Sequence, residues 1–226
     1  MMRAYVRAIT ALLVVALCAS AAPTRARKLY PVDEARRDQS FWTFRERLRR
    51  AVRERDEKFV VSILHPRVEL SFGGHQGVKD FREMWLGRES RGDLWKELGD
   101  VLRLGGAFEA ATGRKSFCAP YTFLKFPRDA DVFEHGAITG KNVRVRARPD
   151  PRAPVVETLS YDVVKAEFFV EVGESGEGAA GWVKVTTPGG RAGYVAEEYI
   201  RSPADYRACF GKYRGRWLMT AFIAGD

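Results

Sequence analysis

The chain has 226 residues, of which 46% are hydrophobic, 30% charged and 12% aromatic. This length suits one large domain or two small ones, and the apolar content excludes an intrinsically disordered protein. The formal charge is +9, but five of these charges lie in the first 28 residues, and residues 137–203 contain nine basic and nine acidic side chains. A nucleic-acid-binding domain concentrates positive charge on one face. The distribution therefore argues against a nucleic-acid partner.

The first 21 residues have the three parts of a secretory signal peptide. Two arginines precede an apolar run at 8–18, and the small residues "ASAA" follow at the expected cleavage site. The run is shorter than the roughly 20 residues that cross a bilayer. An uncleaved membrane anchor remains an alternative, as does a lipoprotein attached at Cys18, although Leu17 stands where a small residue is expected. We expect a periplasmic or secreted protein with no stable membrane span after cleavage.

Export changes how the cysteines are interpreted. Cleavage removes Cys18 and leaves Cys118 and Cys209. Two cysteines in an oxidising compartment most simply form one disulfide. A catalytic thiol is the competing interpretation, but it would need a histidine partner and would be exposed to oxidation. We therefore expect a Cys118–Cys209 bond.

After a tail at 22–32, residues 33–136 predict an α+β domain. Apolar residues spaced by 3, 4, 4 and 7 from Phe41 to Phe59 form one stripe of a helix that Ser40 can cap. Arginines interleaved with acidic residues fill the other side, which indicates a solvated helix face. Further along, we expect a strand at 67–72, a short helix at 78–85, a helix capped by Asp93, and a strand at 121–126.

Residues 137–203 predict a small all-β barrel, because short strands alternate with glycine- and proline-rich turns. "NVRVRA" (142–147) places Val143 and Val145 on one side of a strand and Arg144 and Arg146 on the other. A half-buried sheet needs polar residues on its outer face. We therefore interpret these arginines as mostly structural.

The segments "VRVRARPDPRAPVVETLSYDVVKA" (143–166) and "GWVKVTTPGGRAGYVAEEYI" (181–200) resemble a bacterial SH3 (SH3b, SH3-type 3) domain. Arg148 departs from the pattern, since the family usually has glycine there, and "FFVEVGESGEGAAG" (168–181) is insertion-like. The residues that match the family pattern are Val143, Val145, Arg146, Pro149, Val155, Leu159, Gly181, Trp182, Val185, Gly193, Tyr194, Val195 and Tyr199.

The resemblance implies a binding module with an aromatic groove at the barrel rim. Trp182, Tyr194 and Tyr199 are the expected ligand-binding aromatics, with Arg146 or Arg148 meeting acidic groups. The expected ligand is a peptidoglycan peptide or an envelope protein. Trp182 and Tyr194 can equally be core or rim-packing residues, and that alternative remains open.

Residues 204–226 extend past the point where such a barrel closes. They predict a strand, a turn and a second strand that is almost wholly apolar, as in strands buried on both faces. We expect this hairpin to complete the sheet of the first domain, with the barrel as an insertion and the disulfide tying the two segments together. Residues 51–85 together with this ending resemble NTF2-like (SnoaL-like) cone-shaped domains, which often enclose a pocket.

Enzyme motifs are weak throughout. "SFGGHQG" (71–77) lacks the Lys-Ser/Thr of a phosphate loop. His65, Glu69 and His75 are possible metal ligands without the spacing of a recognised zinc site, and His75 with Asp80 is the least unfavourable catalytic pair. The acidic cluster at 129–135 is interpreted as a solvated linker. We predict a non-catalytic protein without metal or cofactor; the alternative is a small-molecule binder or degenerate enzyme using an NTF2-like pocket.

Overall fold

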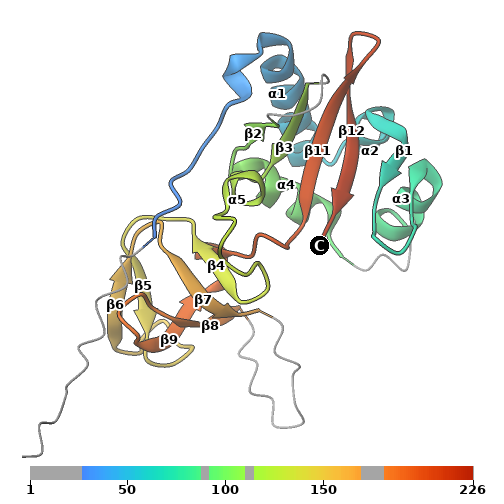
Figure 1. Ribbon diagram of the computed structural model, residues 1–226. Coiled ribbons are helices and arrows are strands. Elements are labelled where there is room, and N and C mark those ends of the chain that lie inside the picture. Colours follow the sequence, from blue (N-terminus) through green and yellow to red (C-terminus); the bar gives the residue numbers. More distant parts are fainter. Residues whose placement is uncertain (1–26, 88–91, 110–114, 169–180, 226) are drawn as a thin grey trace, which may run out of the picture.

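The computed structural model describes residues 27–87, 92–109, 115–168 and 181–225. These residues form an α+β unit and a smaller all-β unit, which lie at opposite ends of the molecule (Figure 1). Both predicted structural classes are therefore confirmed. The predicted signal peptide at 1–21, part of the tail, and most of the insertion-like segment at 168–181 lie outside the described residues.

The α+β unit is built on a five-stranded sheet of order β1-β12-β11-β3-β2. β1 runs parallel to β12, and the other neighbours are antiparallel. The C-terminal hairpin, β11 and β12, thus occupies the interior of a sheet whose other strands come from residues before 120. The strands are β1 (Leu64–Glu69), β2 (Ala107–Phe108), β3 (Ser116–Ala119), β11 (Arg207–Tyr213) and β12 (Arg216–Ile223).

Helices cover one face of this sheet. Helix α1 (Gln39–Glu54) begins one residue before the predicted cap Ser40. It does so because the carboxylate of Asp38 accepts hydrogen bonds from the backbone N–H groups of Ser40 and Phe41. The backbone turns left-handed at Arg55, with φ 53°, which divides the single predicted stripe between two helices. The helical segments are η1 (Ala35–Arg37), α1 (Gln39–Glu54), α2 (Glu57–Ser62), α3 (Gly77–Trp85) and α4 (Leu94–Arg103).

Aromatic rings fill the space between α1 and the sheet. The Phe41 ring centroid lies 4.2 Å from that of Phe117 on β3, 4.9 Å from Trp217 on β12 and 5.8 Å from Phe210 on β11. All four side chains are buried. Rings packed at these distances stabilise a core beyond the effect of their buried area.

Two elements differ from the prediction. Residues 121–126 do not extend as a strand: α5 (Tyr121–Lys125) is helical, because Pro120 cannot donate to a strand ladder and β3 ends before it. The strand predicted at 67–72 is β1 at 64–69, so Phe72 lies outside it and is 62% exposed. β1 tolerates Pro66 because it is an edge strand of the sheet.

In the described residues the all-β unit has seven antiparallel strands of order β10-β4-β7-β8-β9-β5-β6. Val143 and Val145 are buried in its core, whereas Arg144 is exposed. β4 begins two residues before the predicted start of the barrel at 137. The elements are β4 (His135–Ile138), β5 (Val143–Arg146), β6 (Val155–Leu159), β7 (Val163–Glu167), β8 (Trp182–Thr186), β9 (Ala192–Ala196), η2 (Glu197–Tyr199) and β10 (Ile200–Arg201).

The crossing of β9 over β5 depends on Gly193. A Cβ at this position would lie 2.6 Å from Val145 Cγ1 and 2.8 Å from the carbonyl oxygen of Arg146. Only glycine allows so close an approach of the two strands, which closes the barrel at this point.

A strap at residues 27–29 joins the two units. The N–H of Leu29 donates to Tyr161 O at 2.7 Å, and Lys28 forms an ion pair of 2.7 Å with the buried Asp162. A small apolar cluster lies beneath the strap and includes residues from α5, β4 and β7: Leu29, Tyr121, Phe126, Ala137 and Val163. The barrel is thus fixed to the α+β unit by packing as well as by the chain connections.

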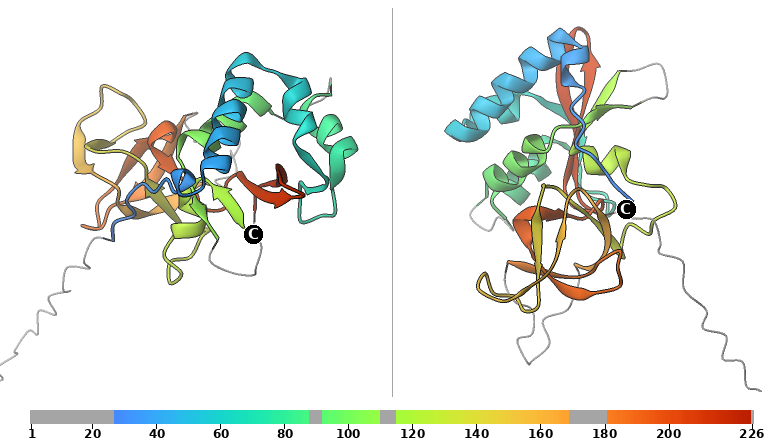
Figure 2. Two further views of the ribbon diagram at one scale, coloured as in Figure 1. Left: turned by 90° about the horizontal axis from the view of Figure 1, so that it is seen from above. Right: turned by 90° about the vertical axis from the view of Figure 1, so that its left-hand side faces the viewer.

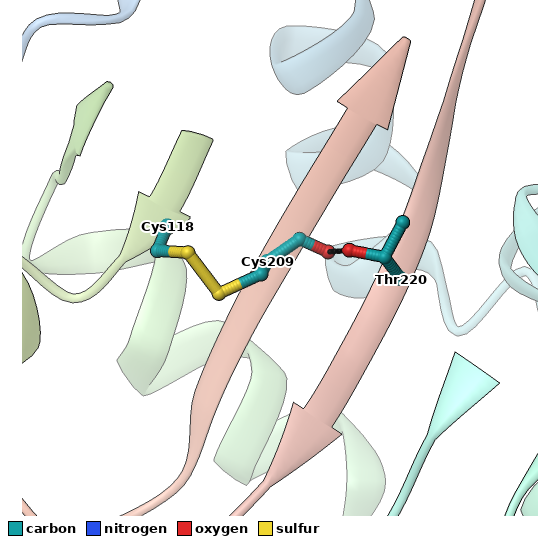
Figure 3. Close-up of a disulfide and its surroundings, with 3 residues drawn as sticks. All are labelled: Cys118, Cys209 and Thr220. Carbon is teal, nitrogen blue, oxygen red and sulfur yellow. Dashed lines mark hydrogen bonds between the residues drawn. A yellow bond between two sulfur atoms is a disulfide. The ribbon is translucent and has the colours of Figure 1, made fainter. Parts of the chain in front are cut away.

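The predicted disulfide between Cys118 and Cys209 is present. The two cysteines lie directly opposite each other on β3 and β11, with their Cα atoms 4.1 Å apart (Figure 3). The hydroxyl of Thr220 on β12 donates to Cys209 O at 3.1 Å. Because 91 positions separate the cysteines, the covalent loop encloses α5 and the whole barrel.

Candidate binding groove

A groove of about 490 Å³ lies on the outer side of the barrel. Arg144 and Arg146 of β5 line it on one side, and Glu198 and Tyr199 of η2 line it on another. Trp182, at the start of β8, contributes the largest ring. The remaining lining residues are Lys141, Asn142, Val143, Pro151 and Ala196.

Strand register explains how the aromatic residues reach the groove. Trp182 lies directly opposite Ala196 on β9, whose single methyl group leaves one side of the half-buried indole accessible. Tyr199 is held by its backbone, since its carbonyl accepts a hydrogen bond of 2.9 Å from Thr139 N–H, and its side chain is 45% exposed. The groove therefore presents two aromatic surfaces on a fixed backbone.

The groove has an excess of positive charge. Lys141 and Arg144 are exposed and form no ion pair within the described part of the chain, and Glu198 is the one acidic side chain in the lining. Arg146 is half-buried, and its Nη1 donates to Ala153 O at 2.7 Å, so it also holds the loop at 147–153. Exposed guanidinium and ammonium groups beside aromatic rings suit a ligand that has carboxylates and apolar parts.

The structure brings together three of the five predicted ligand-binding residues, Arg146, Trp182 and Tyr199. Tyr194 shares the outer face and lies opposite Arg146 and Lys184, but it is outside the lining of the groove. Arg148 is also outside the lining. It does not have a left-handed backbone, and the Asp150 N–H donates to its carbonyl at 2.8 Å, so this loop is formed without the glycine usual in the family.

Arg144 and Lys141 were missed at the level of sequence. The alternation that places Arg146 on the outer face also places Arg144 there, so Arg144 could have been predicted as a ligand-binding residue from the sequence. Lys141 carries no such signal, because it reaches the groove from a turn in which Asn142 has φ 54° and donates its N–H to Ser160 Oγ at 2.8 Å.

A second hollow of about 370 Å³ lies beside β7 and β8 and is lined in part by Phe133. Its charges are balanced: Lys165 pairs with Glu134 at 3.8 Å and Lys184 with Glu167 at 3.0 Å. With no surplus charge to attract a ligand, it is a weaker candidate than the groove.

Of the residues considered for catalysis or metal binding, His75 and Asp80 lie close together at the surface, with His75 Nδ1 3.6 Å from Asp80 Oδ2. The ring of His65 instead lies against that of Tyr213, with the centroids 4.6 Å apart and the planes tilted by 41°. Over the described ranges, no group of three or more His, Cys, Asp or Glu is arranged to hold a metal ion. Nor is any helix in these ranges long and apolar enough to cross a membrane. Cys118 and Cys209 are joined in the disulfide and present no thiol.

Part of the chain matches a known family. The family model of the bacterial SH3 domain matches residues 141–201, which contain β5 to β10 and every lining residue of the groove. The searches of curated proteins and of solved structures gave no match. The NTF2-like resemblance of the α+β unit is unconfirmed and stays a prediction.

Proposed function

We propose that this chain, in which residues 141–201 form a bacterial SH3 domain, is a non-catalytic binding protein of the bacterial cell envelope. Its ligand is an acidic peptide of the cell wall, held in the barrel groove. The observation that carries the proposal is the presence, on one rim of the SH3 barrel, of Trp182 and Tyr199 beside Lys141 and Arg144.

The chemistry of the groove suits a peptide with free carboxylates. A guanidinium–carboxylate hydrogen bond is charge-assisted and stronger than a neutral one, and Arg144 has no competing acidic partner in the described chain. The rings of Trp182 and Tyr199 can cover the apolar parts of the same peptide. Glu198, at the edge of the groove, can meet an ammonium group of the ligand.

An extracytoplasmic location is part of the proposal. It is supported by the disulfide, a bond that persists in oxidising compartments, and by the signal-peptide pattern of residues 1–21. The alternative of a small-molecule pocket in the α+β unit is not supported between α1 and the sheet, since among the described residues the rings of Phe41, Phe117 and Phe210 fill that space.

Co-sedimentation with purified peptidoglycan tests this function. We expect the wild-type chain to be retained, and Tyr199→Ala and Arg144→Gln each to weaken retention about tenfold, the equivalent of roughly 1.4 kcal/mol. The matched controls are Tyr30→Ala and Arg67→Gln, exposed residues outside the groove, which should bind like wild type. Absence of wild-type retention would refute the wall ligand, and equal losses in groove and control variants would refute the groove.

A further inference from the structure

The helix α1 carries an exposed row of arginines that the groove does not involve. Its inner side is buried through Phe41, Leu48 and Val52. Arg47, Arg50 and Arg53 are exposed, as is Arg55 at its C-cap, and none of the four forms an ion pair within the described residues. The acidic residues of this helix are Glu46, which lies 3.6 Å from Arg49, and Glu54. The outer side of α1 is thus strongly cationic.

The turn of the C-terminal hairpin adds three more cations at the same end of the molecule. Lys212, Arg214 and Arg216 are all exposed. The hairpin is tied to the first turn of α1, because Lys212 Nζ and Trp217 Nε1 each donate to Ser40 Oγ at 3.0 Å. Figure 1 shows α1 and the hairpin tip at the end of the molecule opposite the barrel. We name this the distal cationic face: Arg47, Arg50, Arg53, Arg55, Lys212, Arg214 and Arg216.

Within residues 29–226, the surplus positive charge lies mainly at this face. The segments 39–57 and 212–216 contain nine basic residues, one of them the buried Arg45, and four acidic residues, a net charge of +5, whereas residues 29–226 as a whole carry +4. The rest of that range is therefore slightly acidic. An uneven distribution of this kind creates a local positive potential that attracts an anionic partner.

We propose that the distal cationic face docks the protein peripherally on an anionic lipid bilayer. The cations are spread along a helix of 16 residues, about 24 Å long, and an adjacent hairpin tip, which suits an extended charged surface better than one small ligand. Six of the seven are arginines, whose planar groups bind phosphate through two hydrogen bonds. Half-buried Trp42 lies on the same helix, with the guanidinium groups of Arg36 and Arg45 at 4.3 and 4.8 Å from its ring centroid, and tryptophan favours the membrane–water interface.

The binding is electrostatic. Because the apolar side of α1 is already buried in the core, the helix has no free apolar face to insert into the acyl chains. Each lysine or arginine near an anionic surface strengthens binding about fivefold at moderate ionic strength. Salt should weaken the attachment, since the field of the bilayer falls off within about 8–10 Å at physiological ionic strength.

Sedimentation with lipid vesicles tests the proposal on the purified chain. Vesicles of phosphatidylcholine with about one third phosphatidylglycerol are compared with phosphatidylcholine alone. We expect preferential binding to the anionic vesicles, and we expect Arg50→Gln with Arg53→Gln, or Arg214→Gln with Arg216→Gln, to lower the partition coefficient about 25-fold. The matched control is Arg128→Gln with Arg152→Gln, which removes the same charge from exposed sites outside this face and should bind like wild type.

The wild-type chain, the distal variants and the control variant all contain residues 1–28. Any vesicle binding by the apolar run at 8–18 is therefore common to them and does not affect the comparison. Equal binding to neutral and anionic vesicles would overturn the proposal, as would equal losses in the distal and control variants. If heparin is bound through the same arginines while vesicles are not, the partner is a soluble polyanion and the lipid assignment is wrong. None of these outcomes depends on peptidoglycan binding by the groove.

Discussion

Removal of the Cys118–Cys209 disulfide should destabilise the protein by several kcal/mol without removing any strand from the sheet. The bond joins β3 to β11, which also pair through backbone hydrogen bonds from Ser116 to Ala119. In the variant Cys118→Ala with Cys209→Ala this ladder remains, so the native fold should persist. The loss of stability should come mainly from the unfolded chain, which regains the conformational entropy that the cross-link had removed.

The size of the loss depends on whether the barrel unfolds together with the α+β unit. If the whole chain unfolds, the bond closes a loop of 91 residues, which corresponds to about 4.6 kcal/mol at 25 °C in the chain-entropy relation. If the barrel stays folded, Ile138 on β4 remains paired with Ile200 on β10, and the barrel acts as a short link. The free chain in the loop is then roughly 30 residues, and the same relation yields about 3.6 kcal/mol.

Urea unfolding followed by far-UV circular dichroism measures this loss. Reductant is the matched control, since it should lower the stability of the wild type to that of the double variant and leave the variant unchanged. A single transition with a loss near the larger value indicates cooperative unfolding. A loss below about 2 kcal/mol, or no response of the wild type to reductant, would refute the assignment of the bond as the tie between these strands.

Two further substitutions probe the junction and the barrel. Burial raises the pKa of Tyr121 from 10.0 to about 12, and its hydroxyl forms no hydrogen bond with the described residues, so Tyr121→Phe should stabilise the protein by about 1–2 kcal/mol at neutral pH. Between pH 10 and 12 the unfolded chain releases the phenol proton first and wild-type stability falls; Tyr121→Phe should lack this part of the decline, and an identical pH profile in urea titrations would contradict the assignment. Gly193→Ala should destabilise the barrel by about 1–3 kcal/mol, because its methyl group would lie 2.6 Å from Val145 Cγ1. Gly73→Ala, whose nearest neighbour would be 3.6 Å away, is the control, and equal thermal midpoints for both variants would exclude the overlap.

The barrel was the most predictable part of the molecule because its signals are local. Alternation in "NVRVRA" places Val143 and Val145 inside, and each of the remaining predicted strands is bounded by turn residues. The disulfide could be predicted for a different reason: with Cys18 removed, two cysteines allow only one pairing.

Elements whose structure depends on long-range packing were harder to predict. An apolar run such as 121–126 suits a strand or a buried helix equally well; here Pro120 follows the end of β3, and the helix after it places Tyr121 in the apolar cluster at the junction with the barrel. The groove shows the same limit. Trp182 and Tyr199 follow from the family pattern, but Lys141 enters through the left-handed turn at Asn142, a conformation that local spacing does not reveal.

The rigidity of the junction between the α+β unit and the barrel determines how the groove and the distal cationic face would act together. Three chain segments join the units, at 27–29, 119–135 and 201–207, and the apolar cluster around Tyr121 packs between them. A flexible linker would allow the groove and the distal cationic face to meet the same surface, whereas this junction holds the barrel at the end of the molecule opposite α1 and the hairpin tip (Figure 2). A protein attached to a bilayer through α1 would therefore direct its SH3 barrel away from the lipid. That orientation suits the wall ligand proposed for the groove, and under the two proposals together α1 and the groove would be the two ends of one spacer.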